Sequence, residues 1–149
     1  MIQKMSHATI YVLEQDQAKD FYVDKLGFDL KADYTGPNGF RWLTVAPKGQ
    51  SEMEIALVKV GSAAPAETNG AETAKKDIDA MTALLKKGWL SAGAFQTADC
   101  RKTAKELKAK GVEFVGDVED MGWGMVAKMK VPGYGELWVY QPRHASPLS

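Results

Sequence analysis

The sequence contains a single cysteine, Cys100, among its 149 residues. One thiol cannot form an internal disulfide or a thiolate cage for a metal ion, so packing has to stabilise the fold. An excess of charge of either sign is also lacking, because 19 Lys and Arg residues balance 19 Asp and Glu residues. Without a basic field that attracts phosphates, nucleic acid is not expected as a partner.

Long hydrophobic runs are missing as well. The apolar stretches are only a few residues long, far short of the roughly 20 residues that span a bilayer, so no membrane segment is expected. The first residues carry Lys4 but lack the apolar stretch of a secretory signal, which predicts a cytoplasmic protein. Hydrophobic residues at 45% and charged residues at 26% are typical of a globular chain with one core or two small fused cores.

Residues 1–60 alternate between strand-like and helix-like patterns. Residues 6–12 alternate small or polar side chains with apolar ones, which predicts a strand. Asp16 is a good N-cap for a helix that we expect to reach about Leu26, with Gly27 as its C′ residue. Three further strands are predicted over residues 28–33, 40–46 and 52–59, separated by turns rich in Gly, Pro and Asn.

The same pattern returns later in the chain. Residues 61–70 form an Ala-, Gly- and Pro-rich linker, and an amphipathic helix is predicted over residues 71–87. Asp99 then repeats the N-cap 83 residues after Asp16, and Gly111 repeats the C′ glycine 84 residues after Gly27. Strands are predicted over residues 93–97, 112–115, 125–130 and 137–141, which makes a second βαβββ module.

These residues resemble the vicinal oxygen chelate superfamily, which contains glyoxalases, bleomycin-resistance proteins and extradiol dioxygenases. The resemblance rests on the segments 18–22 (AKDFY), 25–28 (KLGF), 97–100 (TADC) and 107–112 (LKAKGV). It implies an α+β fold in which two tandem βαβββ modules form a half-open curved sheet with a cleft that binds a small molecule. It also implies one domain over residues 1–149, with modules at about 5–60 and 91–142, a linker and extra helix at 61–90, and a tail at 143–149.

The resemblance further implies where a metal ion would be held. In metal-dependent members, the first and last strands of each module supply His and Glu ligands, and the corresponding positions here are His7, Ala56, Gly93 and Trp138. A catalytic divalent ion needs about three protein ligands, and His7 supplies one, so we expect no metal cofactor. The alternative is a displaced set of His7, Glu54 and Glu136 with one divalent ion, in a lyase, isomerase or dioxygenase.

His7 has two further interpretations. An imidazole is the side chain best suited to proton transfer near neutral pH, so His7 is the candidate catalytic residue; in the other interpretation it only contacts a ligand or a neighbour. The single cysteine gives a weaker hypothesis. Cys100 begins a predicted helix, whose dipole would lower its thiol pKa, but a buried structural thiol is favoured.

Strand alternation selects the side chains that we expect to line the cleft, and most of them are aromatic. Trp42 or Arg41 and the loop residue Trp123 add further walls, while Gln96 would face the core in this register. The predicted ligand-binding residues are His7, Thr9, Tyr11, Trp42, Glu54, Phe95, Trp123, Glu136, Trp138 and Tyr140.

The sequence therefore predicts a metal-independent aromatic cleft that binds a small organic molecule, in a chain expected to pair as a homodimer. A third interpretation is a module that acts through a partner protein by means of the helix over residues 71–87.

Overall fold

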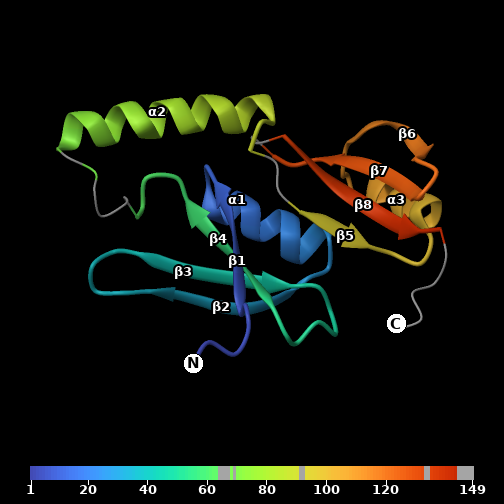
Figure 1. The fold of residues 1–149 in the computed structure, drawn as a ribbon, viewed down its shortest axis with the longest axis horizontal. Helices are drawn as coiled ribbons and strands as arrows, with labels where there is room; N and C mark the ends of the chain where they lie inside the picture. Colours follow the sequence, from blue (N-terminus) through green and yellow to red (C-terminus); the bar gives the residue numbers. More distant parts are fainter. Residues whose placement is uncertain (64–67, 69, 91–92, 133–134, 144–149) are drawn as a thin grey trace. The chain divides into compact units, whose positions relative to one another are not determined.

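The computed structural model describes residues 1–63, 68, 70–90, 93–132 and 135–143 (Figure 1). The chain divides into two compact units, Met1–Lys86 and Lys87–Ser149. Each unit has its own four-stranded sheet, and each is considered separately below. Parts of the predicted linker, residues 64–67 and 69, and most of the predicted tail, residues 144–149, lie outside the described residues.

The first unit carries the first predicted module and a long additional helix. Its sheet has the order β1-β4-β3-β2, with β1 parallel to β4 and the other pairs antiparallel. The parallel pairing requires the helical crossover that follows β1. Its elements are β1 (His7–Val12), α1 (Gln15–Lys19), the π-helix η1 (Asp20–Lys25), β2 (Asp29–Thr35), β3 (Arg41–Ala46), β4 (Glu54–Lys59) and α2 (Ala71–Lys87).

The second unit repeats this arrangement. Its sheet has the order β5-β8-β7-β6, with β5 parallel to β8, so the two predicted βαβββ modules are confirmed. Its elements are β5 (Ala94–Gln96), α3 (Cys100–Ala109), β6 (Phe114–Asp120), β7 (Gly124–Lys130) and β8 (Glu136–Pro142). No helix in the described part of the chain is long and apolar enough to cross a bilayer.

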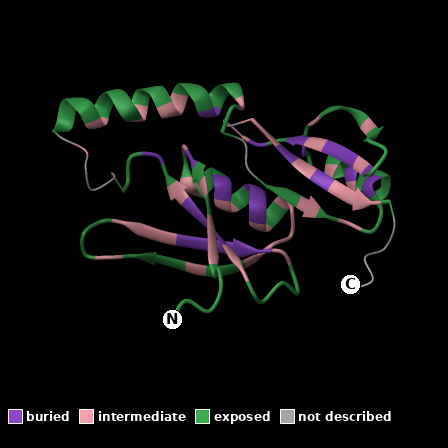
Figure 2. Cartoon of the chain, viewed as in Figure 1, coloured by how far each residue is buried: buried purple, intermediate pink, exposed green. Residues whose placement is uncertain are grey.

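Each unit buries one face of its sheet beneath its short helix (Figure 2). In the first unit the buried side chains include Phe21 and Tyr22 of η1 and Leu43, Val45 and Leu57 of the sheet. In the second unit, α3 contacts β6, β7 and β8, and the buried set includes Cys100, Ala104, Ala127, Met129 and Val139. We call the opposite face of each sheet its open face.

The two helix starts differ, although the sequence repeats an aspartate at both. Asp99 is the N-cap of α3, and its carboxylate accepts a hydrogen bond from the Lys102 backbone N–H, as predicted. The predicted N-cap Asp16 is wrong, because the N-cap is Glu14, two residues earlier, and Asp16 lies in the first turn of α1. Its carboxylate instead binds the Arg41 guanidinium at 2.7 Å. A tertiary ion pair has replaced the local cap.

Arg41 is the centre of an ionic cluster that joins the first helix to the sheet. Its Nε and Nη2 donate to the two carboxylate oxygens of Asp33 at 2.8 and 3.0 Å, and Lys19 Nζ donates to Asp33 Oδ2 at 2.9 Å. These hydrogen bonds, those from Arg41 first, hold the pKa of Asp33 well below its usual range. The cluster therefore favours the ionised carboxylate in the folded chain.

We expect Asp33→Asn to lower the free energy of unfolding by about 1 kcal/mol at neutral pH, because it leaves Arg41 and Lys19 without their shared carboxylate. A lowered folded-state pKa stabilises the chain above the ordinary Asp pKa near 4, and this contribution is lost as the pH falls below that value. Urea titrations at a series of pH values from neutral down to about 3 test this. The stability of Asp33→Asn should fall less steeply with decreasing pH than that of the wild type. Asp24→Asn, whose carboxylate lies outside the cluster, should show the same pH dependence as the wild type.

Candidate functional site

The open face of the first sheet carries a set of polar and aromatic side chains that strand register brings together. In the parallel pair β1–β4, His7 is opposite Glu54, Thr9 opposite Ala56, and Tyr11 opposite Val58. Thr44 of β3 is opposite Ala56, so Trp42, two residues earlier, points to the same face. Arg41 alternates to the other side and belongs to the ionic cluster.

Four of these side chains, with Ser6, form what we call the His7 cluster. The His7 and Trp42 ring centroids are 5.2 Å apart, and Ser6 Oγ lies 2.9 Å from His7 Nδ1. On the other side of the imidazole, His7 Nε2 is 3.9 Å from Glu54 Oε2. The Thr44 hydroxyl donates to Glu54 Oε1 at 2.7 Å, which holds the carboxylate in place.

The His7 cluster is accessible from solvent but supported from within the sheet. The side chains of His7 and Glu54 are 34% and 33% exposed, whereas Thr44 is fully buried. An oriented carboxylate next to an imidazole can accept hydrogen bonds from a ligand and can share a proton with the ring. The sequence analysis missed Thr44, although its position two residues after Trp42 was a signal that both share the open face.

The donor set of the first unit does not fit the metal site that the superfamily resemblance implies. One imidazole and one carboxylate are two protein ligands, fewer than the three that a catalytic divalent ion usually needs. Ala56, at the position on β4 where the resemblance implies a ligand, has no side-chain donor atom. Among the residues that the structure describes, no group of three or more His, Cys, Asp or Glu side chains is arranged to hold a metal ion.

The open face of the second sheet is aromatic and carries a cation. The β7–β8 register places Lys128 opposite Trp138 and Val126 opposite Tyr140. Lys128 Nζ lies 5.9 Å from the Trp138 ring centroid, within reach of a cation–π interaction. The Glu136 side chain shares this face with Trp138 because the two are separated by one residue on β8.

Strand β5 corrects one of the predicted cleft residues. Its register pairs Ala94 with Trp138, Phe95 with Val139 and Gln96 with Tyr140. Phe95 therefore lies on the helix-covered face with buried Val139, and its predicted position beside Trp138 and Tyr140 is wrong. Gln96 is exposed on the open face instead of facing the core. A strand of three residues is too short for alternation in the sequence to determine its phase.

Gly124 allows an aromatic pair to form at the start of β7. The Trp123 and Tyr140 ring centroids are 5.5 Å apart, and the Trp123 side chain is largely exposed. A Cβ atom on Gly124 would lie 2.5 Å from Tyr140 Cε2 and 2.6 Å from the Gln141 carbonyl oxygen. The ring of Tyr140 thus occupies the space that a side chain at position 124 would need.

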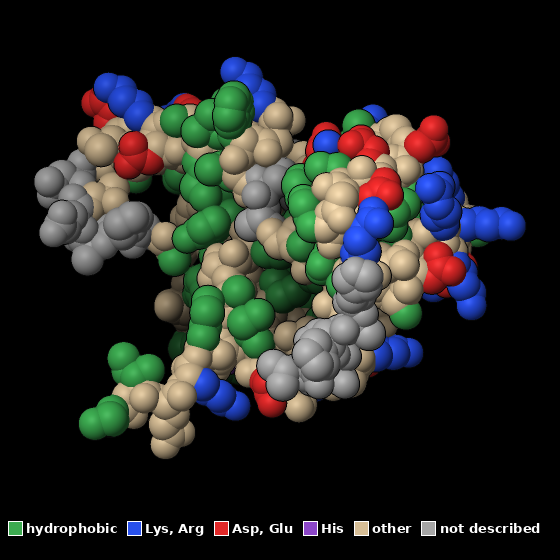
Figure 3. Space-filling view, turned by 45° about the vertical axis from the view of Figure 1, so that its right-hand side comes forward, with side chains coloured by type: hydrophobic (Ala, Val, Ile, Leu, Met, Phe, Trp, Pro, Cys, Tyr) green, Lys and Arg blue, Asp and Glu red, His purple; other side chains and the backbone are tan. Residues whose placement is uncertain are grey.

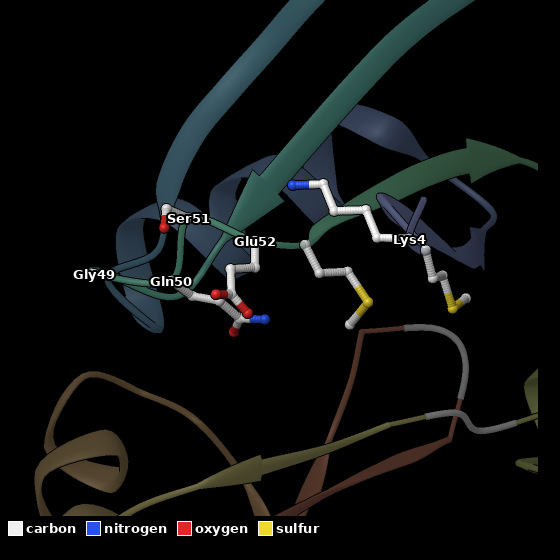
Figure 4. A pocket seen from close by; sticks show the side chains of 7 residues that line it. Lys4, Gly49, Gln50, Ser51 and Glu52 are labelled. Atoms are coloured by element: carbon white, nitrogen blue, oxygen red, sulfur yellow. The ribbon is translucent and has the colours of Figure 1, made fainter. Parts of the chain in front are cut away.

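A wide hollow of about 570 Å³ lies in the first unit near the start of β1 and β4 (Figure 4). Lys4, Gln50 and Glu52 point their side chains into it from the N-terminal segment and the β3–β4 loop. None of the described residues that line it is aromatic. The hollow therefore lacks the stacking surface that the open faces offer.

Neither Cys100 nor a strong surface charge adds to the candidate site. Cys100 is fully buried, and burial raises the pKa of its thiol, which agrees with the favoured structural role. On the face shown in Figure 3, acidic and basic side chains are interspersed. This distribution fits the balanced net charge of the sequence.

We expect Gly124→Ala to lower the free energy of unfolding by about 1–3 kcal/mol, because the new methyl group overlaps Tyr140 and the adjacent backbone. The change should also alter tryptophan fluorescence, since Trp123 contacts the displaced ring. Gly36→Ala is the matched control, because its Cβ would come no nearer than 3.1 Å to any neighbour, the Asn38 side-chain oxygen, and would meet the next atoms at 3.8 Å. Equal stability of the two variants would contradict the packing argument.

Comparisons with known proteins agree with this architecture. Residues 4–138 match the family model of the Glyoxalase/Bleomycin resistance protein/Dioxygenase superfamily. The uncharacterized protein YetH of Bacillus subtilis (strain 168) is 32% identical over 131 residues, which cover 87% of this chain and 91% of YetH.

Two solved structures are also similar. UcmS2 is 33% identical with a TM-score of 0.79, covering 94% of this chain and 98% of UcmS2. TnmS3, an antibiotic binding protein from Streptomyces sp. CB03234, is 30% identical with a TM-score of 0.68, covering 95% of this chain and 97% of TnmS3. The family match, the two βαβββ units and these likenesses lead to one conclusion: the chain belongs to the glyoxalase/bleomycin resistance protein/dioxygenase superfamily.

Proposed function

We propose that the chain binds a small planar organic molecule on the aromatic open faces of its sheets, without the help of a metal ion. The observation that carries this proposal is the placement of Trp42, Trp138 and Tyr140. All three are on faces that their unit's helix does not cover, and all are only half-buried. Large rings left accessible on an otherwise well-packed sheet are typical of a binding surface.

The polar groups on these faces would orient the ligand. On the first sheet, Glu54 presents Oε2 beside His7 while Thr44 satisfies Oε1, so a hydrogen-bond donor of the ligand would find an oriented acceptor. On the second sheet, Lys128 above Trp138 offers a cation at the edge of a stacking surface. A few placed polar groups among aromatic rings are typical of small-molecule sites.

The remaining predicted contacts follow from strand register. Thr9 and Tyr11 continue the His7 face along β1, and Glu136 continues the Trp138 face along β8. Trp123 extends the second face through its contact with Tyr140. We propose all of these as ligand contacts, and His7 as a contact whose catalytic role stays a prediction.

The likeness to TnmS3 supports the class of ligand. TnmS3 is described as an antibiotic binding protein, and the two chains match over nearly their whole lengths. An antibiotic or another natural product with a planar ring system is therefore our first candidate for the bound molecule. The homodimer and the cytoplasmic location expected from the sequence stay predictions.

The binding proposal can be tested with a fluorescent planar probe, anilinonaphthalene sulfonate, followed by a panel of aromatic antibiotics. We expect Trp42→Ala and Trp138→Ala each to lower the measured affinity about tenfold, because each removes a stacking surface. Trp89→Ala is the matched control, since Trp89 is 77% exposed and lies on neither sheet. Wild-type affinity in both test variants would contradict the proposal.

The proposal that no metal ion is needed has its own test. We expect dialysis against a chelator to leave ligand affinity and thermal stability unchanged, because His7 and Glu54 are too few ligands for tight binding of a divalent ion. Elemental analysis of the purified chain measures the metal content directly. Stoichiometric metal that is lost in both His7→Ala and Glu136→Ala would instead support the displaced His7, Glu54 and Glu136 set of a metal-dependent enzyme.

A further inference from the structure

The first unit contains a second cavity, which is distinct from the His7 cluster. It has a volume of about 220 Å³ and lies between α2 and the ends of β1 and β4. Ala74, Ile78 and Met81 line it from one side of the helix, and Val60 and Gly61 line it from the segment after β4. None of the residues of the His7 cluster lines this cavity.

A close backbone contact holds α2 over the cavity. Gly61 has a φ of +86°, and a Cβ atom there would lie 2.8 Å from Ile78 Cδ1, so the glycine allows Ile78 to approach the chain. The rest of the helix is packed less closely, because Leu85 is its only buried residue. The apolar side chains of Ala74, Ile78 and Met81 on one side of α2 therefore face a cavity and not a filled core.

The polar groups of the cavity indicate what it would bind. Asp77 is the only charged side chain among the described lining residues. Neighbouring charges on α2 are used in pairs, Lys75 with Asp79 at 2.7 Å and Lys76 with Glu72 at 3.5 Å, whereas Asp77 forms no ion pair in the described part of the chain. Tyr11 lines the cavity from the sheet side.

The volume limits the size of the ligand. A protein cavity of about 150 Å³ lined by apolar side chains is known to hold benzene, which has six non-hydrogen atoms. By the same ratio, 220 Å³ holds about nine such atoms. That is one aromatic ring with a short substituent.

We propose that this cavity binds a small aromatic amine, with the ring against Ile78 and Met81 and the ammonium group at the Asp77 carboxylate. The apolar walls favour the ring, the thioether of Met81 offers a sulfur–aromatic contact, and the carboxylate favours a cation over an anion. The proposal goes beyond binding on the open faces, with which it shares only Tyr11, and it does not depend on that function.

The test uses three probes of similar size and different charge: phenethylamine, phenethyl alcohol and phenylacetate. Each is titrated into the full chain carrying ¹³C-labelled Ile and Met methyl groups, and binding is followed by NMR. We expect phenethylamine to bind most tightly and phenylacetate most weakly, with shifts at the methyl groups of Ile78 and Met81. Equal affinities for the amine and the acid, or shifts that leave these two methyl groups unchanged, would overturn the proposal.

Two pairs of variants separate charge from shape. Asp77→Asn should lower the affinity for phenethylamine about threefold to tenfold and leave that for phenethyl alcohol unchanged, because only the amine uses the carboxylate. Asp79→Asn, on the same helix but paired with Lys75, is the control. Ala74→Trp should fill the cavity and abolish binding of both probes, whereas Ala80→Trp, at an exposed position outside the lining, should not.

The outcomes also separate this site from the open faces. The Ala74→Trp variant should keep the near-UV circular dichroism and cooperative unfolding of the wild type, which shows that its fold is retained, and it should still bind anilinonaphthalene sulfonate. Loss of amine binding with retained dye binding supports the cavity, and amine binding that survives Ala74→Trp overturns it. A wild-type chain that binds the amine but not the dye would contradict the proposed function alone.

Discussion

The one-sided covering of each sheet is the constraint on which the rest of this structure depends. In both units the last strand pairs in parallel with the first, β4 with β1 and β8 with β5. The helix that follows the first strand must then cross over a single face of the sheet. That face is sealed by Phe21 and Tyr22 in the first unit and by Cys100 and Ala104 in the second. On the other face, His7, Glu54 and Trp42 of the first unit and Trp138 and Tyr140 of the second are left partly exposed, while Thr44 is buried beneath Glu54.

The open faces of the two sheets carry different side chains, although the two sheets have corresponding strand orders. The first holds an imidazole, an indole and a carboxylate that Thr44 orients from beneath. The second holds two rings, Trp138 and Tyr140, with an ammonium group above one of them. At two of the positions where the superfamily resemblance implies metal ligands, on the last strand of each module, this chain has Ala56 and Trp138. The side chains on these faces offer rings for stacking and polar atoms for hydrogen bonding.

Helix α2 belongs to neither βαβββ module, and it adds a third kind of surface. It is an amphipathic helix whose apolar stripe is only partly used for packing, and Gly61 fixes its distance from the sheet. A small apolar cavity with one carboxylate follows from that arrangement. The first unit therefore offers two sites of different size and polarity, one on the sheet and one beneath the helix.

The sequence by itself determined the modules, because local signals repeat in them: an N-cap at Asp99, C′ glycines at Gly27 and Gly111, and alternation in strands of six or seven residues. Where these local signals were weak or competed with other contacts, the tertiary structure determined the conformation. Asp16 lost its capping role to the ion pair with Arg41, and the phase of three-residue β5 came from pairing with β8, which turned Phe95 toward the helix. The contact between Thr44 and Glu54 joins two strands, and the contact between Ile78 and Gly61 joins α2 to the segment after β4. Such contacts depend on distances in space, which no local pattern of residues contains.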